Sequence, residues 1–348
     1  MSIKKILLLV VVLVTAAFVL SACAGPAGSV GPAGPAGPVG PAGPAGTAPT
    51  AAELTCTQCH NNTTLIDSKQ FAWAASKHGP AGVAWAEEGQ TQTCAPCHNG
   101  SSFIDRIAAG QSFADYASAK DVILAGNTPT TCRTCHTIHT TYTKDDFALR
   151  TVAPVAMVTS GQTFDKGKGN LCVNCHQARR YMANFPAKDA SGAAIPGSYA
   201  ASIRFNPHLS NQSDMMLGVG GGGTVTGSPS AHYTMTTDSC VTCHLGSSAN
   251  HTFKASVTAC VVCHADAKST DIDGAVTKIQ AKYDQLKAAL TTAGLIDATG
   301  TGVAGTYEEA KAFPLWVYGY ITEDGSMGVH NPKYANDLLD AALAGLGK

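Results

Sequence analysis

Six copies of Cys-x-x-Cys-His constrain this chain more than any other feature of its sequence. The copies begin at residues 56, 94, 132, 172, 240 and 260 of a chain of 348 residues. Two thiols three residues apart on a short helical turn, followed at once by an imidazole, form the attachment site of a c-type haem. The thiols add to the two vinyl groups of one porphyrin, and the imidazole ligates its iron. Six copies therefore predict six covalently attached haem c groups.

The motifs use twelve of the 13 cysteines, and the thirteenth is Cys23. The cysteines predicted to hold the porphyrins are Cys56, Cys59, Cys94, Cys97, Cys132, Cys135, Cys172, Cys175, Cys240, Cys243, Cys260 and Cys263. The predicted proximal iron ligands are His60, His98, His136, His176, His244 and His264. A zinc site needs four ligands from two motifs and gives no reason for a histidine after every second cysteine. A redox-active Cys-x-x-Cys pair rarely needs six copies.

Six histidines lie outside the motifs, as many as the predicted irons. They are His78, His139, His208, His232, His251 and His330. A single histidine of this kind more often packs in a core or lies at the surface, but the matching count favours six distal ligands. His139 follows His136 by three residues, on the same face of a predicted helix, so it is expected to serve a neighbouring haem. His251 lies between motifs five and six and could serve either of their neighbours.

The first 22 residues are typical of a secretion signal. Lys4 and Lys5 precede an apolar run from Ile6 to Val19, which is short for a membrane span. The next four residues, Leu20-Ser21-Ala22-Cys23, resemble the bacterial lipobox and predict lipidation of Cys23, with cleavage at a non-lipidated site as the alternative. Several acyl chains on one cysteine anchor a protein stably. No Asp follows Cys23, which favours the outer membrane or cell surface within an extracytoplasmic location.

Residues 23–50 form a collagen-like linker. Glycine recurs every third residue from Gly25 to Gly46, most often followed by proline. This pattern is typical of a collagen triple helix, but the run is short. A semi-rigid polyproline-II spacer that holds the rest of the chain away from the membrane is the favoured interpretation, and a trimerising stalk is the alternative.

The remaining chain is predicted to be a six-haem domain at 51–265 and a C-terminal helical region at 266–348. Aromatic residues make up only 7% and charged residues 14% of the sequence, so large apolar porphyrins are expected to replace much of an ordinary core. The predicted fold class is therefore mainly α with much irregular chain, packed around haems, with little or no β-sheet. The net charge of −1 gives no reason to expect a nucleic acid partner.

Three helices are predicted in the C-terminal region. Apolar residues recur at helical spacing from Val276 to Leu290, after Asp271 and Asp273 as candidate caps and before Gly294 as the stop. Thr306 with Glu309 predicts a capping box for a second helix, which Pro314 is expected to kink or delay. Asn331 and Pro332 predict the start of a third helix that ends near Leu346, and His330 stands just before it.

Three further features have plainer interpretations. Met215 and Met216 are predicted to pack rather than to ligate iron, because six histidines are available. Arg179 and Arg180, just after motif four, fit either pairing with haem propionates or a solvated basic face. The glycine-rich stretch 218–223 lacks a phosphate-binding signature, and it is expected to be a flexible loop near a haem face.

The motifs and their flanks resemble those of multihaem c-type cytochromes of anaerobically respiring bacteria. Three further stretches carry the resemblance, at 170–179, from His208 to Cys240, and at 327–335. The last is similar to the C-terminal distal-ligand helix of the nitrite reductase and hydroxylamine oxidoreductase superfamily. The resemblance implies haem c and anaerobic respiratory chemistry, but these families contain both electron carriers and enzymes.

The ligand count favours an electron carrier with no catalytic residue. Ammonia-forming nitrite reductases replace one motif histidine by lysine, and no Cys-x-x-Cys-Lys occurs here. A reductase of a nitrogen or sulfur oxyanion is the first alternative, and it requires that His208 or His330 is not a ligand. A subunit of a conductive cytochrome filament is the second. The expected partners are redox proteins or an extracellular electron acceptor, together with the membrane, and the expected state is a monomer or a stalk-mediated trimer.

Overall fold

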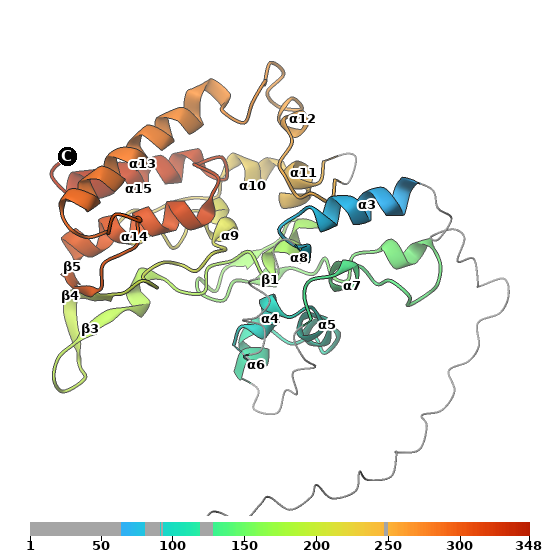
Figure 1. Cartoon of the computed structure of the whole chain (residues 1–348), viewed down its shortest axis with the longest axis horizontal. Coiled ribbons are helices and arrows are strands. Elements are labelled where there is room, and N and C mark those ends of the chain that lie inside the picture. Colours follow the sequence, from blue (N-terminus) through green and yellow to red (C-terminus); the bar gives the residue numbers. More distant parts are fainter. Residues whose placement is uncertain (1–63, 81–90, 92, 119–127, 247–249) are drawn as a thin grey trace, which may run out of the picture. The chain divides into compact units, whose positions relative to one another are not determined.

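The computed structural model describes residues 64–80, 91, 93–118, 128–246 and 250–348. All of them belong to the unit formed by residues 50–348, shown in Figure 1. The predicted signal segment, the lipidation site Cys23, the linker 23–50 and motif one (Cys56, Cys59 and His60) lie outside the described residues. As predicted, the described chain is mainly helical with much irregular chain, and its sheets are small.

The helices before the C-terminal region are short. Their bounds are α3 Thr64–Ala74, α4 Ala95–His98, α5 Gly100–Ala108, α6 Phe113–Ser118, α7 Cys132–Cys135, α8 Gly169–Val173, α9 Gln212–Leu217, α10 Ala231–Met235, α11 Cys240–His244 and α12 Val257–Cys260. Single 3-10 turns occur at Lys144–Phe147, Met182–Asn184 and Ile272–Gly274. Helices this short are not stable alone in water, so tertiary contacts must hold them.

The described motifs adopt the helical turn that the sequence predicts. In four of them the backbone N–H of the motif histidine donates to the carbonyl of the first cysteine, at 2.8 to 3.0 Å. These histidines are His98, His136, His176 and His264. The hydrogen bond spans one turn, so it keeps both thiols and the imidazole of a motif in one compact loop of backbone. In motif five the whole motif is helix α11.

The C-terminal helices are longer and pack on one another (Figure 1). They are α13 Ala275–Thr292, α14 Glu309–Asp324 and α15 Pro332–Gly345. Their shared core contains the fully buried side chains of Leu286, Trp316, Tyr320 and Leu338. This apolar cluster is the only large one among the described residues, so the C-terminal region is the conventional hydrophobic part of the described chain.

Most of the predicted helix limits are confirmed. Asp271 accepts hydrogen bonds from the backbone of Val276 and Thr277 at 2.7 and 3.2 Å, whereas Asp273 is in the left-handed region with φ 53° and caps nothing through its side chain. Gly294, with φ 68°, follows the end of α13. The Asn331 side chain accepts from the Tyr334 N–H and caps α15.

The predicted capping box at Thr306 is wrong. Thr306 lies in a strand and pairs with Ala200, and α14 begins at Glu309 without a side-chain cap. The helix runs through Pro314. The strand forms because residues before the helix complete the edge of a small sheet, and this tertiary pairing overrides the local capping signal.

Two antiparallel sheets are present among the described residues. Strand β1 Val155–Ala156 pairs with β2 Thr163–Phe164. The second sheet has the order β3-β4-β5, with the bounds β3 Pro186–Lys188, β4 Ala194–Ala201 and β5 Gly305–Glu308. Since β4 follows motif four and β5 directly precedes α14, this sheet ties the motif-bearing chain to the C-terminal helices.

The glycine-rich stretch after α9 packs on aromatic side chains rather than standing open as a flexible loop. Gly218 ends α9 in the left-handed conformation at φ 73°. A Cβ atom on Gly220 would lie 2.5 Å from the Tyr181 ring, and one on Gly223 would lie 2.7 Å from the Phe313 ring. Glycine is therefore required here for close approach of backbone to ring. Met215 and Met216 are buried in the two apolar clusters, as expected for packing residues.

Candidate haem-binding site

The described chain places five motif histidines each opposite one histidine from outside the motifs. Their ring centroids are separated by 5.9 to 6.4 Å. The pairs are His176 with His78 (6.0 Å), His98 with His208 (5.9 Å), His136 with His251 (6.1 Å), His264 with His232 (6.4 Å) and His244 with His330 (6.3 Å). Every pair joins one predicted proximal ligand to one predicted distal ligand.

This separation fits two imidazoles on opposite faces of one metal ion. A metal–imidazole bond is about 2 Å long, and the coordinating nitrogen lies roughly 1 Å from the centre of its ring, so two ligands in line give about 6 Å between centroids. If the rings were only in packing contact, there would be no reason for every pair to join a motif histidine to a histidine from outside the motifs. The five pairs are therefore suited to hold the iron of a porphyrin whose vinyl groups reach the thiols of the same motif.

Hydrogen bonds fix the orientation of five of these rings. Carbonyl oxygens accept from Nδ1 of three of them: Phe147 O from His136 (2.7 Å), Val329 O from His232 (2.6 Å) and Phe253 O from His244 (2.8 Å). Gln212 Oε1 accepts from His176 at 3.0 Å, and Asp324 Oδ1 accepts from His330 at 2.6 Å. Because a carbonyl can only accept, Nδ1 carries the proton and Nε2 carries the lone pair that ligates a metal.

Burial favours the neutral, ligating form of several rings. Burial, with a smaller effect from His176, lowers the pKa of His78 to about 4. Burial also lowers the pKa values of His176 and His244. His330 differs, because burial disfavours its charged form but the Asp324 carboxylate holds its pKa above the usual value. A metal-binding imidazole must be neutral at Nε2, so the lowered pKa values of the first three rings, for which burial is the largest cause, favour ligation.

The predicted placement of His139 on a helical face is wrong. Helix α7 ends at Cys135, and His136 is extended, with φ −113° and ψ 154°. His136 forms an isolated bridge with Leu149, which draws the chain out of the helix. His139 then lies in a turn with φ 63° and stacks on Tyr142 at 5.6 Å between ring centroids.

Asp146 holds the turn that carries His139. Its carboxylate accepts from the backbone N–H groups of His139, Thr140, Thr141 and Tyr142 and from the Thr141 hydroxyl, at 2.6 to 3.2 Å. These bonds outweigh the opposing effect of burial and lower the pKa of Asp146 to about 2. The left-handed backbone at His139 costs conformational energy, and the hydrogen bonds to the Asp146 carboxylate offset this cost.

The motif thiols lie close to one another across motifs. Cys97 of motif two and Cys175 of motif four are hydrogen-bonding neighbours, as are Cys172 of motif four and Cys240 of motif five. Cys135 of motif three lies near both motif-four thiols, since it affects the electrostatics of each. Cys243 of motif five is similarly near both thiols of motif six. Motif four thus adjoins motifs two, three and five, and motif five adjoins motif six.

Phe253 contacts three of the histidine pairs. Its ring lies edge-on to His78, at 4.6 Å between centroids, and to His251, at 5.8 Å. Its carbonyl accepts from His244 Nδ1. One residue therefore touches a ligand from the pairs of motifs four, three and five, and it does so with a backbone φ of 56°. This role could not be predicted from the sequence, because a single phenylalanine in a loop between motifs belongs to no recognisable pattern.

Arginine side chains near motifs two and four are not a solvated basic face. Arg106 is buried, donates to Asn174 Oδ1 at 2.7 Å and leaves its Nε without a partner. Half-buried Arg179 stacks 4.1 Å from the centroid of the Phe113 ring. Half-buried Arg180 donates to Asn206, and its buried Nε also has no partner. In the described part of the chain no carboxylate pairs with any of these three arginines, a pattern that suits anionic propionates.

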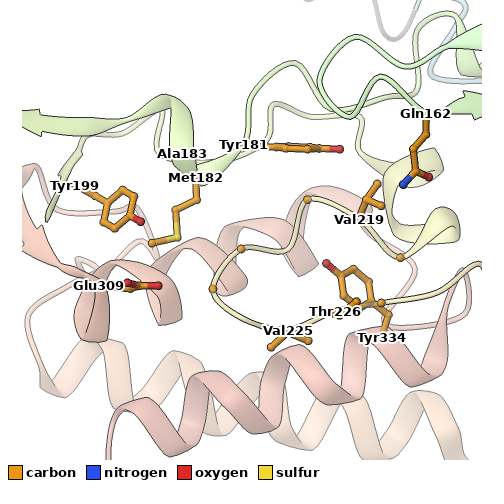
Figure 2. A pocket seen from close by; sticks show the side chains of 15 residues that line it. Gln162, Tyr181, Met182, Ala183, Tyr199, Val219, Val225, Thr226, Glu309 and Tyr334 are labelled. Carbon is orange, nitrogen blue, oxygen red and sulfur yellow. The ribbon is translucent and has the colours of Figure 1, made fainter. Parts of the chain in front are cut away.

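One cleft in the described structure is lined by none of the paired histidines. It measures about 470 Å³ and surrounds the glycine-rich loop, with Tyr181 and Met182 on one side and Tyr334 on the other (Figure 2). Neither a motif cysteine nor a histidine lines it. The cleft follows from the missing side chains of the loop and carries none of the predicted ligands.

Gln212 and Asp324 are site residues that the sequence did not reveal. Each accepts a hydrogen bond from the ring of a candidate ligand histidine. The spacing in sequence between acceptor and histidine matches no known motif. Gln212 is further held by its own Nε2, which donates to the carbonyls of Glu323 and Asp324 at 2.9 and 3.2 Å. Helices α9 and α14 thus meet at the rings of His176 and His330.

The described residues contain no group of three or more His, Cys, Asp or Glu side chains placed to hold a metal ion by themselves. None of the helices in the described ranges is both long and apolar enough to cross a bilayer.

Comparison with known proteins finds one matching family model and one similar solved structure. The family model described as cytochrome c7 and related cytochrome c matches residues 46–137, a range that contains motifs one to three. One solved structure, the outer cell wall cytochrome OcwA, aligns with a TM-score of 0.49 at 22% identity, over 80% of this chain and 50% of that one. The chain therefore spans about half the length of this structure. No curated protein matches the chain.

The repeated motifs, the opposed histidine rings and the family match together define a multihaem c-type cytochrome. Haem c bound through thioether bonds is its cofactor. The motif cysteines are the residues that would form the covalent links, and the motif histidines are the candidates for one axial ligand each.

Proposed function

We propose that this protein transfers electrons through six covalently bound c-type haems, each with two histidine ligands. The observation that carries the proposal is the set of five opposed ring pairs at 5.9 to 6.4 Å. An iron closed on both faces by imidazole has no position for a substrate. Such an iron changes oxidation state with little movement of its ligands, which suits it to electron transfer.

The distal ligands follow from the pairs. His208, His251, His78, His330 and His232 serve the haems of motifs two to six in that order. Once these five are assigned, His139 and His60 are the remaining distal and proximal candidates. By elimination, His139 is proposed to serve the first haem, whose proximal candidate His60 lies outside the described residues.

The neighbouring thiols give the order in which haems can exchange electrons. Motif four adjoins motifs two, three and five, and motif five adjoins motif six. The vinyl groups of bound porphyrins would lie at these thiols, so porphyrins of neighbouring motifs would offer short steps for an electron. Among the described motifs two to six, the haem of motif four would then be a branch point and the haem of motif six would adjoin that of motif five alone.

The surroundings of the protein complete the proposal. A lipid on Cys23 anchors the chain outside the cytoplasm, at the outer membrane or cell surface, and residues 23–50 space the haems from the bilayer. Redox partner proteins or an extracellular electron acceptor exchange electrons with the terminal haems. The chain acts as a monomer, or as a trimer if the collagen-like stalk associates.

Exposure of the fully reduced holoprotein to carbon monoxide and to nitrite tests the electron-carrier function. Six closed irons predict unchanged low-spin optical spectra with both reagents. Rapid carbon monoxide binding by one haem, together with nitrite turnover, would instead favour a reductase with one open iron.

A further inference from the structure

His330 differs from the other oriented ligand rings in what its Nδ1 contacts. Its acceptor is the carboxylate of Asp324, at 2.6 Å, whereas the acceptors of His136, His176, His232 and His244 are neutral carbonyl or amide oxygens. A carboxylate acceptor strengthens a hydrogen bond and draws the proton away from the ring. Among these five rings His330 therefore has the most imidazolate character.

The surroundings of Asp324 increase this effect. Its side chain is fully buried, so water does not screen the charge. It is the last residue of α14, where the helix dipole is negative and makes a carboxylate a stronger acceptor. Its second oxygen accepts from both the backbone N–H and the hydroxyl of Ser326, and that hydroxyl in turn accepts from the His330 N–H. The carboxylate and the ring are thus held in a fixed relation.

We propose that Asp324 sets the reduction potential of the motif-five haem by polarising His330, and makes this iron the lowest in potential of those served by the five oriented rings. The inference rests on the proposed ligation of that iron by His244 and His330. A more anionic ligand and a buried negative charge both stabilise ferric over ferrous iron, which lowers the potential. Asp324 acts through His330 and is a positioning residue.

The position of this haem gives the low potential a consequence. Motif five lies between motif four and motif six, because Cys240 adjoins Cys172 and Cys243 adjoins the motif-six thiols. An electron that travels between the haems of motifs four and six by way of motif five would cross the iron that is hardest to reduce. The motif-five haem is therefore the last to be reduced on this branch and holds electrons only briefly.

A redox titration of the holoprotein, followed by electron paramagnetic resonance, tests the inference with three variants. Asp324→Asn keeps an oxygen acceptor but removes the charge, and it is expected to raise one haem potential and shift the g-values of one low-spin signal. Ser326→Ala removes the hydroxyl donor to the carboxylate but keeps the backbone donor, and it is expected to lower the same potential. Asp337→Asn is the matched control, because it removes a carboxylate on α15 that pairs with Lys333 instead of a histidine; all potentials should stay unchanged.

The outcomes separate this inference from the electron-carrier function. Six low-spin haems with no potential moved by Asp324→Asn, or moved no more than by Asp337→Asn, would overturn the role of Asp324 alone. If His330 no longer ligates the iron in Asp324→Asn and one iron becomes high-spin, the Ser326→Ala variant tests the inference instead. A reduction potential that rises or stays unchanged in Ser326→Ala would overturn the inference. A wild-type iron that is already high-spin would count against the ligand assignment itself.

Discussion

The imidazole rings of His98 and His208 face each other at 5.9 Å between centroids, although a long stretch of chain separates them. His98 ends a one-turn helix of motif two, and His208 lies in irregular chain with φ 76°. The His208 N–H donates to Asn206 Oδ1 at 3.0 Å and the His208 carbonyl accepts from Ser210 at 2.6 Å. Local hydrogen bonds thus hold a left-handed backbone that presents the distal ring to the proximal one.

Removal of this distal ring should open one iron. His208→Ala is expected to convert one of six low-spin haems to a form that binds carbon monoxide and has a higher potential, because an axial ligand is lost. Leu209→Ala, which removes a side chain that is 73% exposed, is the neighbouring control and should change neither property. Carbon monoxide titration of the reduced proteins measures the difference. An unchanged haem count with no new binding in His208→Ala would show that His208 is not a ligand.

Asp146 is expected to control the order of the His139 turn. Asp146→Ala removes the acceptor of four backbone N–H groups, so hydrogen exchange at residues 139–142 should become markedly faster. Asp146→Asn retains one acceptor oxygen and should give an intermediate rate. Amide exchange measured by mass spectrometry or NMR on the holoprotein tests this ranking of the three rates. Equal exchange rates in wild type, Asp146→Asn and Asp146→Ala would contradict the prediction.

Asp214 should make stability depend on pH. Burial outweighs the hydrogen bonds from Ala178 N–H and the Tyr181 hydroxyl and raises the pKa of Asp214 from 3.8 to about 6. The folded chain therefore binds this proton more tightly than the unfolded chain does. Its contribution to stability is full below about pH 4 and is lost as the pH rises through about 6, a change of about 3 kcal/mol.

The comparison of wild type with Asp214→Asn isolates this carboxyl group. The free energy of unfolding of wild type, relative to the variant, should fall between pH 4 and pH 7, because asparagine does not titrate. Denaturant unfolding at several pH values measures the difference in the free energy of unfolding between the two proteins. Effects of acid on the haem ligands are the same in both proteins and cancel in this difference. A difference that stays constant across this range would contradict the raised pKa.

The glycine-rich loop should tolerate a methyl group poorly. Gly220 and Gly192 have nearly the same backbone angle, φ 84° and 85°, but a Cβ on Gly220 would strike the Tyr181 ring, whereas a Cβ on Gly192 meets nothing within 4 Å. Gly192→Ala is expected to cost about 1 kcal/mol through the strained angle alone. Gly220→Ala should cost roughly 1 to 3 kcal/mol more through overpacking. Equal melting temperatures of the two variants would show that the loop is not packed as described.

Much of the site could be predicted from the sequence because covalent chemistry fixes it. A haem attachment motif specifies cysteine spacing and a proximal histidine regardless of the surrounding fold, and the six spare histidines then stood out by number. The helix from Ala275 and the helix from Pro332 were also predictable, since their apolar periodicity and caps are local signals. The distal assignments were not, because each pair joins segments brought together only by tertiary structure.

Other features depended on long-range contacts that no local pattern encodes. Thr306 has the spacing of a capping residue but pairs with β4, and His139 has helical spacing from His136 but follows a helix that ends at Cys135. Gln212 accepts from His176, which is remote from it in sequence, and Asp324 accepts from His330 across the turn that follows α14. In each case a tertiary contact outweighs the preference of the local sequence.

Quantitative electron paramagnetic resonance of the oxidised holoprotein, normalised to its chemically determined haem content, tests the closure of every iron by two imidazoles most directly. Ligation of every iron by two histidines predicts six low-spin ferric haems per chain and no high-spin ferric signal. A high-spin signal that integrates to one haem, or a total below six, would contradict it.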